Sequence, residues 1–463
     1  MAIATESVKI PYLSSEADVI TFENGHRLVF VSKPGSVFNI STWIKTGSIH
    51  ETAENNGVSH FLEHLMFKGT ERFAPGDFDK AMESMGAVIN AATWKDFTFY
   101  YVTGPVGERQ KTSLGENFAR ALDMHADMML YSTLPEKEIG PQYDPFDENY
   151  AGEKRERSVV IEEISMREDQ PWTKVYNTVN HMMYPDGHPY QRDVIGTRAI
   201  IGGIPRECIE NYYDTWYSPN AMTTIVVGDF EFELLKSQVA KTFNFPQKKQ
   251  TNPPFKTTQD FSLKNFVPES RYAEITGDYQ TAFFLQGYHG PTPENLKETI
   301  ALDIVCHALS DGRSARLVQT FIEKPEKPIF NYIGCDQSTF KLGNVFFAQG
   351  NFNVTGHDKT PKEVLDLMTA EIEALLTTHP LTQEEFDRAY KYLKVGFAQT
   401  SETAAGIAET IGESLTVTNS LESYTHYLET LQGLTLEAVN AIARQYLTAD
   451  KAFTAVMVPT SAQ

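Results

Sequence analysis

The chain has few cysteines and no long apolar run, and both absences narrow its class. Its three cysteines (Cys208, Cys306 and Cys335) are scattered and have no CxxC spacing, which excludes a disulfide framework and a thiolate zinc knuckle. No stretch approaches the roughly 20 apolar residues that span a bilayer, so we expect no membrane insertion. The N-terminal residues also lack the basic start and apolar core of a signal peptide. We therefore predict reduced thiols and a cytoplasmic protein of bacterial type.

Basic residues are also few: the chain has 40 Lys and Arg residues but 61 Asp and Glu residues, which gives a formal net charge of −21. So acidic a chain is not expected to bind nucleic acid or an anionic membrane surface. Two readings of the charge stay open: an acidic chamber that attracts basic peptides, or charge that only keeps the protein soluble. At 463 residues, 41% of them hydrophobic, the chain exceeds a single core and predicts two globular domains.

The most specific motif in the chain is HFLEH at residues 60–64. Residues four apart share one face of a helix, so His60 and His64 can hold one metal ion together. Glu63 leans toward the same side, close enough to reach a water on that metal. This HxxEH pattern reverses the HExxH motif of zinc peptidases and predicts a metal-dependent hydrolase. The alternative is a packed or solvent-facing pair of histidines.

A catalytic zinc needs a third protein ligand and one open position. The segment 152–168 reads as a carboxylate-rich helix with an apolar stripe of Val and Ile. Glu156 and Glu163 lie seven apart and share a face of that helix, whereas Glu162 points about a third of a turn away. The alternative for such a pair of glutamates is a solvated face.

Further motifs give the chain a family resemblance. They are HFLEHLMFKGT at 60–70, MGA at 85–87, NAAT at 90–93, ERSVVIEE at 156–163, HP at 188–189 and IGT at 195–197. Together they resemble the pitrilysin/insulinase superfamily of zinc metallopeptidases, and most of all its branch of proteins like the mitochondrial processing peptidase. The likeness runs from about residue 18 to the C-terminus, dense in the first half and thin in the second.

The resemblance implies roles for several residues. Zn²⁺ would be held by His60, His64 and Glu163, with Glu156 as a supporting carboxylate and Glu63 as the residue that activates water. An Arg and a Tyr of the second half are expected at the substrate or oxyanion, and the Arg maps to Arg316. The position of the Tyr carries Phe330, so Tyr332 serves only if the register shifts. The alternative for this pair is a structural helix Arg and a core aromatic.

Two segments of the first half bear on substrate access. Residues 88–93 resemble the family's edge strand, where an extended substrate adds through Asn90, Ala91 and Ala92; an ordinary internal strand is the alternative. The gap between His64 and Glu163 is longer than the family pattern, and the surplus falls in 139–152. This run is rich in Pro, Gly, Asp and Tyr and reads as an inserted loop.

The sequence also contains a weak internal repeat. Residues 201–217 and 224–227 match 431–447 and 454–457 at an offset of 230, and 41–47 echo 281–287 at an offset of 240. We predict an N-terminal catalytic domain (1–245), a Pro-rich linker (246–270) and a duplicated C-terminal domain (271–463) that lacks HxxEH and clamps substrate. The expected fold class is α+β. Each domain would be a largely antiparallel sheet packed with helices, and together they would enclose a substrate chamber.

Local patterns support this division into strands and helices. An Asn-Gly hairpin is expected at 21–31, an alternating strand at 38–45, and helices at 75–84, 115–130 and 361–376.

The predicted function is a zinc-dependent endopeptidase acting on peptides or unstructured protein segments, alone or as a homodimer. Two alternatives remain open. One is the catalytic subunit of a heterodimeric processing peptidase that needs a related partner chain. The other is a non-catalytic structural or assembly subunit.

Overall fold

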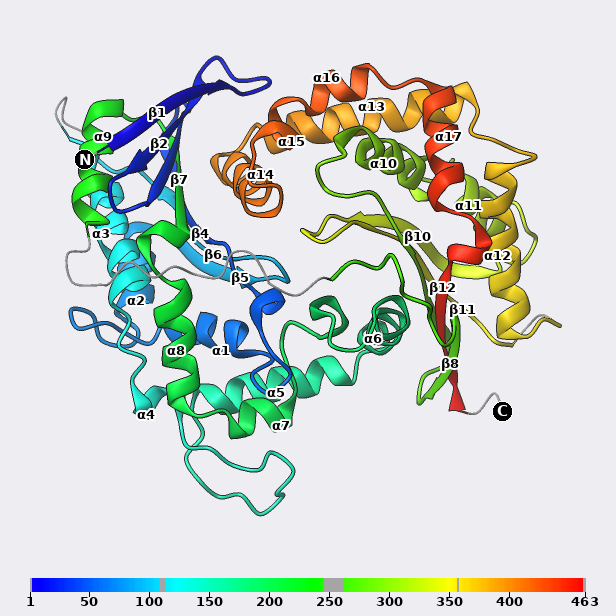
Figure 1. Cartoon of the computed structure of the whole chain (residues 1–463), viewed down its shortest axis with the longest axis horizontal. Helices are drawn as coiled ribbons and strands as arrows, with labels where there is room; N and C mark the ends of the chain where they lie inside the picture. The colour runs from blue at the N-terminus through cyan, green and yellow to red at the C-terminus, as the bar shows by residue number, and fades with distance from the viewer. Residues whose placement is uncertain (1, 109–112, 245–260, 356–357, 461–463) are drawn as a thin grey trace. The chain divides into compact units, whose positions relative to one another are not determined.

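The computed structural model describes residues 2–108, 113–244, 261–355 and 358–460, which form two compact units (Figure 1). Unit 1 comprises Met1–Ser165, Arg192–Asp260 and Ala398–Thr425. Unit 2 comprises Met166–Gln191, Phe261–Phe397 and His426–Gln463. Of the predicted linker 246–270, residues 246–260 lie outside the described residues.

Unit 1 is built on a seven-stranded sheet with the order β1-β2-β3-β7-β4-β6-β5. Its neighbouring strands run antiparallel except β3 and β7, which are parallel. The central strand β7 is a run of Thr, Ile and Val buried along its whole length, as expected of a strand covered on both faces. The bounds are β1 Ala2–Lys9, β2 Glu16–Phe22, β3 Arg27–Ser32, β4 Val37–Ile44, β5 Val88–Thr93, β6 Thr98–Pro105 and β7 Met222–Gly228.

Unit 2 repeats five consecutive strands of this sheet, from β3 to the edge strand β5, and has no counterpart of β1 and β2 among its described strands. Its order β8-β12-β9-β11-β10 corresponds to β3-β7-β4-β6-β5, and the parallel pair again lies at the same place, between β8 and β12. The bounds are β8 Tyr272–Gly277, β9 Ala282–His289, β10 Phe330–Ser338, β11 Val345–Phe352 and β12 Phe453–Pro459. The predicted fold class, two duplicated α+β domains, is confirmed.

The strand pairing also tests the two internal echoes. Thr224 pairs with Thr42 in unit 1, and Thr454, its match at an offset of 230, pairs with Gln286 in unit 2. Thr42 therefore corresponds to Gln286. The echo of 41–47 in 281–287 is consequently four residues out of register, because similar apolar strands match one another at more than one offset.

Helices cover each sheet and give each unit a hydrophobic core of its own. The helices of unit 1 are α1 Val58–Met66, α2 Asp77–Met85, α3 Glu116–Tyr131, α4 Glu136–Ile139, α5 Glu156–Glu168, α7 Arg198–Gly203, α8 Arg206–Trp216 and α9 Phe232–Thr242, where α5 runs past Ser165 into unit 2. Those of unit 2 are α10 Leu296–Ser310, α11 Arg316–Val318, α12 Pro361–Leu376, α13 Gln383–Thr400, α16 Tyr427–Gln432 and α17 Leu436–Tyr446. The three predicted helices appear as α2, α3 and α12.

Two helical segments depart from the predicted division of the chain. Helix α6 (Pro171–Met183), from the first half, packs on β9 and β12 of unit 2. Helix α14 (Ala404–Val417), from the second half, packs on β4 and β7 of unit 1 and is followed by the short α15 (Glu422–Thr425). The predicted domain ranges 1–245 and 271–463 therefore need correction. Residues 166–191 belong to unit 2 and residues 398–425 to unit 1, because α6 and α14 each pack on the sheet formed by the other half of the chain.

The predicted local patterns are present in unit 1. Gly25 has φ +80° in the hairpin between β2 and β3, where the Phe22 amide bonds the His26 carbonyl. On β4, Thr42 bonds His125 of α3, while the next residue, Trp43, packs against α14. Residues 139–152 include the end of α4 and an irregular loop, in which Tyr143 stacks on Tyr150.

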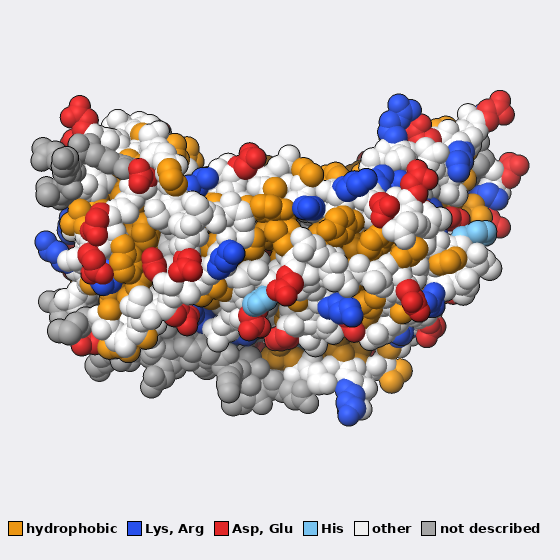
Figure 2. Space-filling view, turned by 90° about the horizontal axis from the view of Figure 1, so that it is seen from above, with side chains coloured by type: hydrophobic (Ala, Val, Ile, Leu, Met, Phe, Trp, Pro, Cys, Tyr) orange, Lys and Arg blue, Asp and Glu red, His pale blue; other side chains and the backbone are white. Residues whose placement is uncertain are grey.

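The described part of the chain contains no helix that is both long and apolar enough to cross a membrane. On the face drawn in Figure 2, acidic and basic side chains of the described residues are interspersed with one another.

Candidate metal centre

Helix α1 is a short helix with one face buried in the core of unit 1. Phe61, Leu62, Leu65 and Met66 are fully buried. Removing each such side chain from water stabilises the fold by up to about 1.5–3 kcal/mol, which fixes the helix against the sheet. The opposite face carries His60 and His64.

The start of α1 depends on a glycine and on an acid from outside the helix. Gly57 has φ +94°, and a Cβ there would lie 2.6 Å from the Ile195 carbonyl oxygen, so no larger residue fits without a shift. The buried Glu51 carboxylate accepts hydrogen bonds from the Gly57 amide (2.8 Å), the Ser59 amide (2.9 Å), the Ser59 hydroxyl and the Asn56 side chain (2.8 Å). Burial raises the pKa of Glu51, and these hydrogen bonds oppose the rise.

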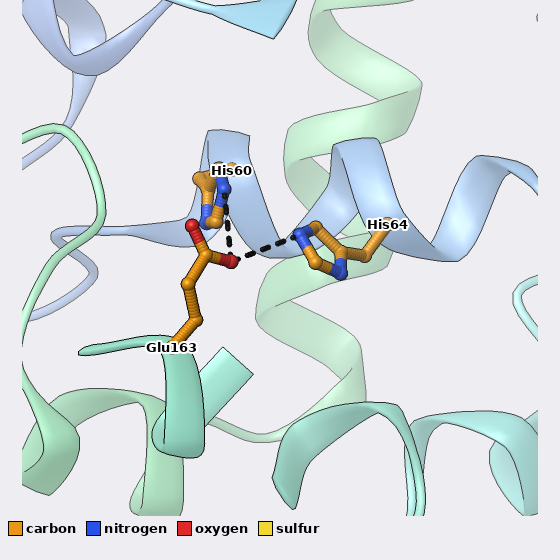
Figure 3. Close-up of side chains that lie close together, drawn as sticks. All are labelled: His60, His64 and Glu163. Atoms are coloured by element: carbon orange, nitrogen blue, oxygen red, sulfur yellow. Dashed lines mark ion pairs between the residues drawn. The ribbon is translucent and has the colours of Figure 1, made fainter. Parts of the chain in front are cut away.

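The two histidines of α1 meet a carboxylate of α5 (Figure 3). Glu163 Oε2 lies 3.8 Å from His60 Nε2 and 3.5 Å from His64 Nε2. One ligand atom from each residue falls within 4.8 Å of the other two. Among the described residues, this is the one group of three or more His, Cys, Asp or Glu side chains that meets this criterion.

This donor set fits zinc. In a tetrahedral site with bonds of about 2.0–2.1 Å, ligand atoms lie roughly 3.3 Å apart, so both contacts of Glu163 with the histidines (3.8 and 3.5 Å) are within about half an ångström of that separation. Two imidazoles and one carboxylate with an open fourth position are typical of catalytic zinc. The side chains of Glu163 and His64 are 34% and 21% exposed, so solvent reaches this group of residues.

Glu156 and Lys68 hold His64 from its other side. His64 Nδ1 lies 3.0 Å from Glu156 Oε1, and Lys68 Nζ lies 2.6 Å from Glu156 Oε2. Burial on its own would raise the pKa of Glu156, but the hydrogen bonds with His64 and Lys68 lower it. With Nδ1 engaged in this way, His64 Nε2 is the nitrogen that faces Glu163.

The carboxylates around His64 favour positive charge. Burial lowers the pKa of the His64 ring, but hydrogen bonds with Glu156 and Glu163 raise it more, to about 9. The same carboxylates that stabilise a proton on this ring also stabilise a metal cation, because both add positive charge at the same place.

Glu63 is buried beside His60, His64 and Glu163. Its Oε2 accepts a hydrogen bond of 2.6 Å from Thr93 Oγ1, at the end of β5. Burial raises the pKa of Glu63, while the Thr93 hydrogen bond and the charge of His64 lower it. A carboxylate whose pKa is raised by burial is a stronger base than one in water.

The neighbouring Glu162 faces away from the histidines. Its exposed carboxylate pairs with Lys154 at 3.1 Å. Of the two adjacent glutamates, Glu163 is therefore the one at the histidines.

Asn90, Ala91 and Ala92 lie on β5, the edge strand of the unit 1 sheet. Strand β5 pairs with β6 on one side, which excludes the internal strand and leaves the other side as a sheet edge. The same strand ends at Thr93, which contacts Glu63, so this edge leads to the buried carboxylate.

Arg316 and Tyr332 belong to unit 2. Arg316 forms a two-pronged ion pair with Glu385 (2.9 and 2.7 Å) and donates to the carbonyls of His379 and Pro380. Tyr332 is 47% exposed and stands edge-on to Trp172, while Phe330 is buried in the core. These contacts give Arg316 a structural role, and catalytic roles for either residue stay predictions.

Sequence reasoning missed Glu51, Thr93 and Lys68 as partners of the centre. Lys68 and Thr93 stand within or beside motifs quoted above, but nothing in the motifs states which atoms they contact. Glu51 lies six residues before the N-cap of α1, outside the spacing of a capping box.

Fold and site together define a metallopeptidase with duplicated α+β domains, one of which carries an inverted HxxEH motif. The family model described as "Insulinase (Peptidase family M16)" matches residues 27–195, and the model "Peptidase M16 inactive domain" matches residues 203–393. The chain belongs to the insulinase family, M16, within the pitrilysin/insulinase superfamily.

Named relatives agree with this class. A Bacillus subtilis protein with the name "Uncharacterized zinc protease YmxG" is 27% identical over 440 residues, 93% of this chain and 96% of the relative. "Zinc protease PqqE" of Helicobacter pylori is 27% identical over 452 residues, 95% of this chain and 92% of the relative. A solved structure of a protease from Helicobacter pylori matches the fold, with a TM-score of 0.80 at 23% identity, over 97% of this chain and 100% of that one.

Proposed function

We propose that this chain is a zinc-dependent endopeptidase that hydrolyses peptides or unstructured protein segments. His60, His64 and Glu163 would hold the zinc, with Glu156 orienting His64 and Glu63 acting as the general base. The observation that carries the proposal is the meeting of one ligand atom each from His60, His64 and Glu163 within 4.8 Å, beside the buried Glu63 carboxylate.

Zinc, when bound, supplies Lewis-acid chemistry that makes water more acidic and polarises a carbonyl. Glu63 accepts the proton of the attacking water as the oxygen bonds to the peptide carbon, and then gives that proton to the amine nitrogen as the C–N bond breaks. Thr93 holds one Glu63 oxygen, so the other is the one that takes the proton. A substrate added to β5 as a strand, along Asn90, Ala91 and Ala92, would lie beside this base.

Replacing Glu63 with Gln tests this assignment. We expect zinc content to stay at one per chain and hydrolysis of an unstructured peptide to fall by about 10²–10⁴-fold, because the amide cannot accept the proton. The matched control is Glu162→Gln, which changes an exposed glutamate of the same type and should leave hydrolysis unchanged. Hydrolysis at the original rate in Glu63→Gln would refute the role of Glu63 as base.

The same assay tests whether the chain needs a partner. We infer that the chain acts by itself or as a homodimer, so the purified chain should cleave the peptide without addition of a second protein. Cleavage that requires a related chain would instead favour the heterodimeric processing peptidase. The proposed compartment is the cytoplasm, in keeping with the three free thiols.

A further inference from the structure

Helix α1 begins without a capping side chain of its own. Its N-cap is Gly57, which has none, and the amides of Gly57 and Ser59 point instead at Glu51. Glu51 is 5% exposed, and its two oxygens together accept four hydrogen bonds. A buried carboxylate is stable only where hydrogen bonds replace its lost hydration, and here all four come from the start of one helix.

We propose that Glu51 is a positioning residue of the metal centre, which fixes the first turn of α1 and thereby aims His60 at Glu163. The proposal rests on the function proposed above, since it concerns the same zinc. It assigns to Glu51 no contact with zinc or substrate.

The position of His60 makes it sensitive to this anchor. His60 follows Ser59, the residue that gives Glu51 two of its four hydrogen bonds. A ring nitrogen about 6 Å from the helix axis moves by roughly 1 Å when the helix turns by 10°. A metal cage tolerates about half that displacement before affinity falls.

The rest of residue Glu51 is held as firmly as its carboxylate. Arg192 Nη2 donates to the Glu51 carbonyl oxygen at 2.7 Å. Asn56 Nδ2 donates both to the Glu51 carboxylate and, at 2.9 Å, to the Asp193 carbonyl oxygen. One amide group therefore connects Glu51 with the segment at Asp193. Together these contacts fix the loop 51–57 against the segment at Arg192 and Asp193, and α1 starts from a fixed point.

At its other end, α1 is followed by Lys68, whose ammonium pairs with Glu156. His60 therefore depends mainly on the Glu51 end, and His64 on the Glu156 end. Loss of Glu51 should disturb one ligand of three, which weakens zinc binding without abolishing it.

The test is the zinc dissociation constant of the whole chain, measured by competition with a chromogenic chelator, for the wild type, Glu51→Gln, Ser59→Ala and Glu54→Gln. In Glu51→Gln the side-chain NH2 group cannot accept the hydrogen bonds that the Gly57 and Ser59 amides donate to the carboxylate. We therefore expect zinc affinity to fall roughly 10-fold. Ser59→Ala removes one donor and should lower affinity about threefold, in the same direction. Glu54→Gln, an exposed acid of the same loop, should leave it unchanged.

A second readout separates positioning from general loss of structure. At saturating zinc, we expect the KM of Glu51→Gln for the peptide to match the wild type while kcat is lower, because the edge strand β5 is untouched. A folded Glu51→Gln protein with the zinc affinity of the wild type would overturn the proposal. If Glu51→Gln does not fold, Ser59→Ala decides, and unchanged zinc affinity there overturns it equally. Failure of the wild type to bind zinc would instead refute the proposed function.

Discussion

The two units share a plan of five strands and differ in the helix that contacts the edge strand, α1 in unit 1 and α10 in unit 2. In unit 1, Thr93 at the end of β5 donates to Glu63 on α1 at 2.6 Å. In unit 2, Gln337 near the end of β10 donates to Asp303 on α10 at 2.9 Å. The strand pairings align Thr93 with Gln337, so Asp303 stands where Glu63 stands.

The residues around these two carboxylates differ in kind. His60 and His64 flank Glu63, whereas Ile300 and Ile304 occupy the same offsets from Asp303 and are fully buried in the core of unit 2. A buried or half-buried carboxylate held by an edge strand is therefore present in both units. What makes unit 1 a candidate metal centre is the pair of imidazoles, with Glu163 facing them.

The largest expected effect comes from making α1 resemble α10. The double change His60→Ile and His64→Ile should abolish zinc binding and lower peptide hydrolysis more than 10³-fold, because two of three ligands are lost. Elemental mass spectrometry and a peptide-cleavage assay check both results.

The control for this change is His181→Ile, which replaces an exposed histidine of α6 and should retain zinc and activity. Zinc bound at the original ratio by a folded double variant would show that the comparison between α1 and α10 misplaces the site.

The exchanged helices offer a second contrast between the units. Trp43 of β4 meets Gly412 of α14, whereas Gly287, at the corresponding place on β9, meets Met183 of α6. Large and small residues are thus reversed. A Cβ on Gly412 would lie 1.9 Å from Trp43 Cε2.

Gly412→Ala should therefore destabilise the protein by about 2–3 kcal/mol through overpacking. Urea unfolding followed by tryptophan fluorescence measures this loss. The matched control is Gly396→Ala on α13, where the added Cβ meets no atom within 4 Å and should stabilise by about 1 kcal/mol. Equal stability of the Gly412→Ala variant and the wild type would mean that α14 does not pack on β4 as described.

One hydrogen bond between sheet and helix also differs between the units in its response to acid. His125 of α3 bonds Thr42, and burial lowers the pKa of His125 to about 3. In unit 2 the corresponding bond joins Gln286 to Thr369, which does not titrate. Below pH 6.5 the unfolded chain takes up a proton at His125 that the folded chain refuses, so stability is full above pH 6.5 and falls toward pH 3.

His125→Gln should remove this dependence. Between pH 6.5 and 3 the slope of the unfolding free energy should flatten by up to about 1.4 kcal/mol per pH unit, or about 2 kcal/mol in total by pH 5. Urea unfolding at pH 7.5, 6 and 5 gives the slope, and an unchanged slope would contradict the assignment.

The smallest effect concerns the groups around the imidazoles. Lys68→Met removes the ion pair with Glu156, so His64 loses the support of a fixed carboxylate. Zinc affinity should fall roughly 10-fold, with hydrolysis retained at saturating zinc. Lys80→Met, at an exposed position of α2, is the control. If both variants bind zinc as the wild type does, the imidazoles and Glu163 alone account for the centre.

The local features of the molecule were predictable from the sequence, because each is written in adjacent residues. The spacing of His60, Glu63 and His64 places them on one short helix, and the Asn-Gly pair predicts the first hairpin. Glu163 was preferred over Glu162 through the family resemblance, and its position facing both histidines agrees with that preference.

Features that depend on tertiary structure were not predictable. An amphipathic pattern shows that α6 and α14 bury one face, but it does not specify the sheet, and each packs on the sheet of the other half. Glu51 caps α1 only because the loop 51–57 folds back on the helix. Arg316 was expected at the substrate or oxyanion from the family resemblance, and the sequence does not reveal its ion pair with Glu385.

X-ray absorption at the zinc edge of the zinc-loaded chain tests the central claim most directly. We predict one zinc per chain with only nitrogen and oxygen neighbours at about 2.0–2.1 Å, two of them showing the outer-shell scattering of imidazole. A sulfur neighbour at about 2.3 Å, or a spectrum unchanged by His64→Ala, would place the zinc elsewhere and contradict the account.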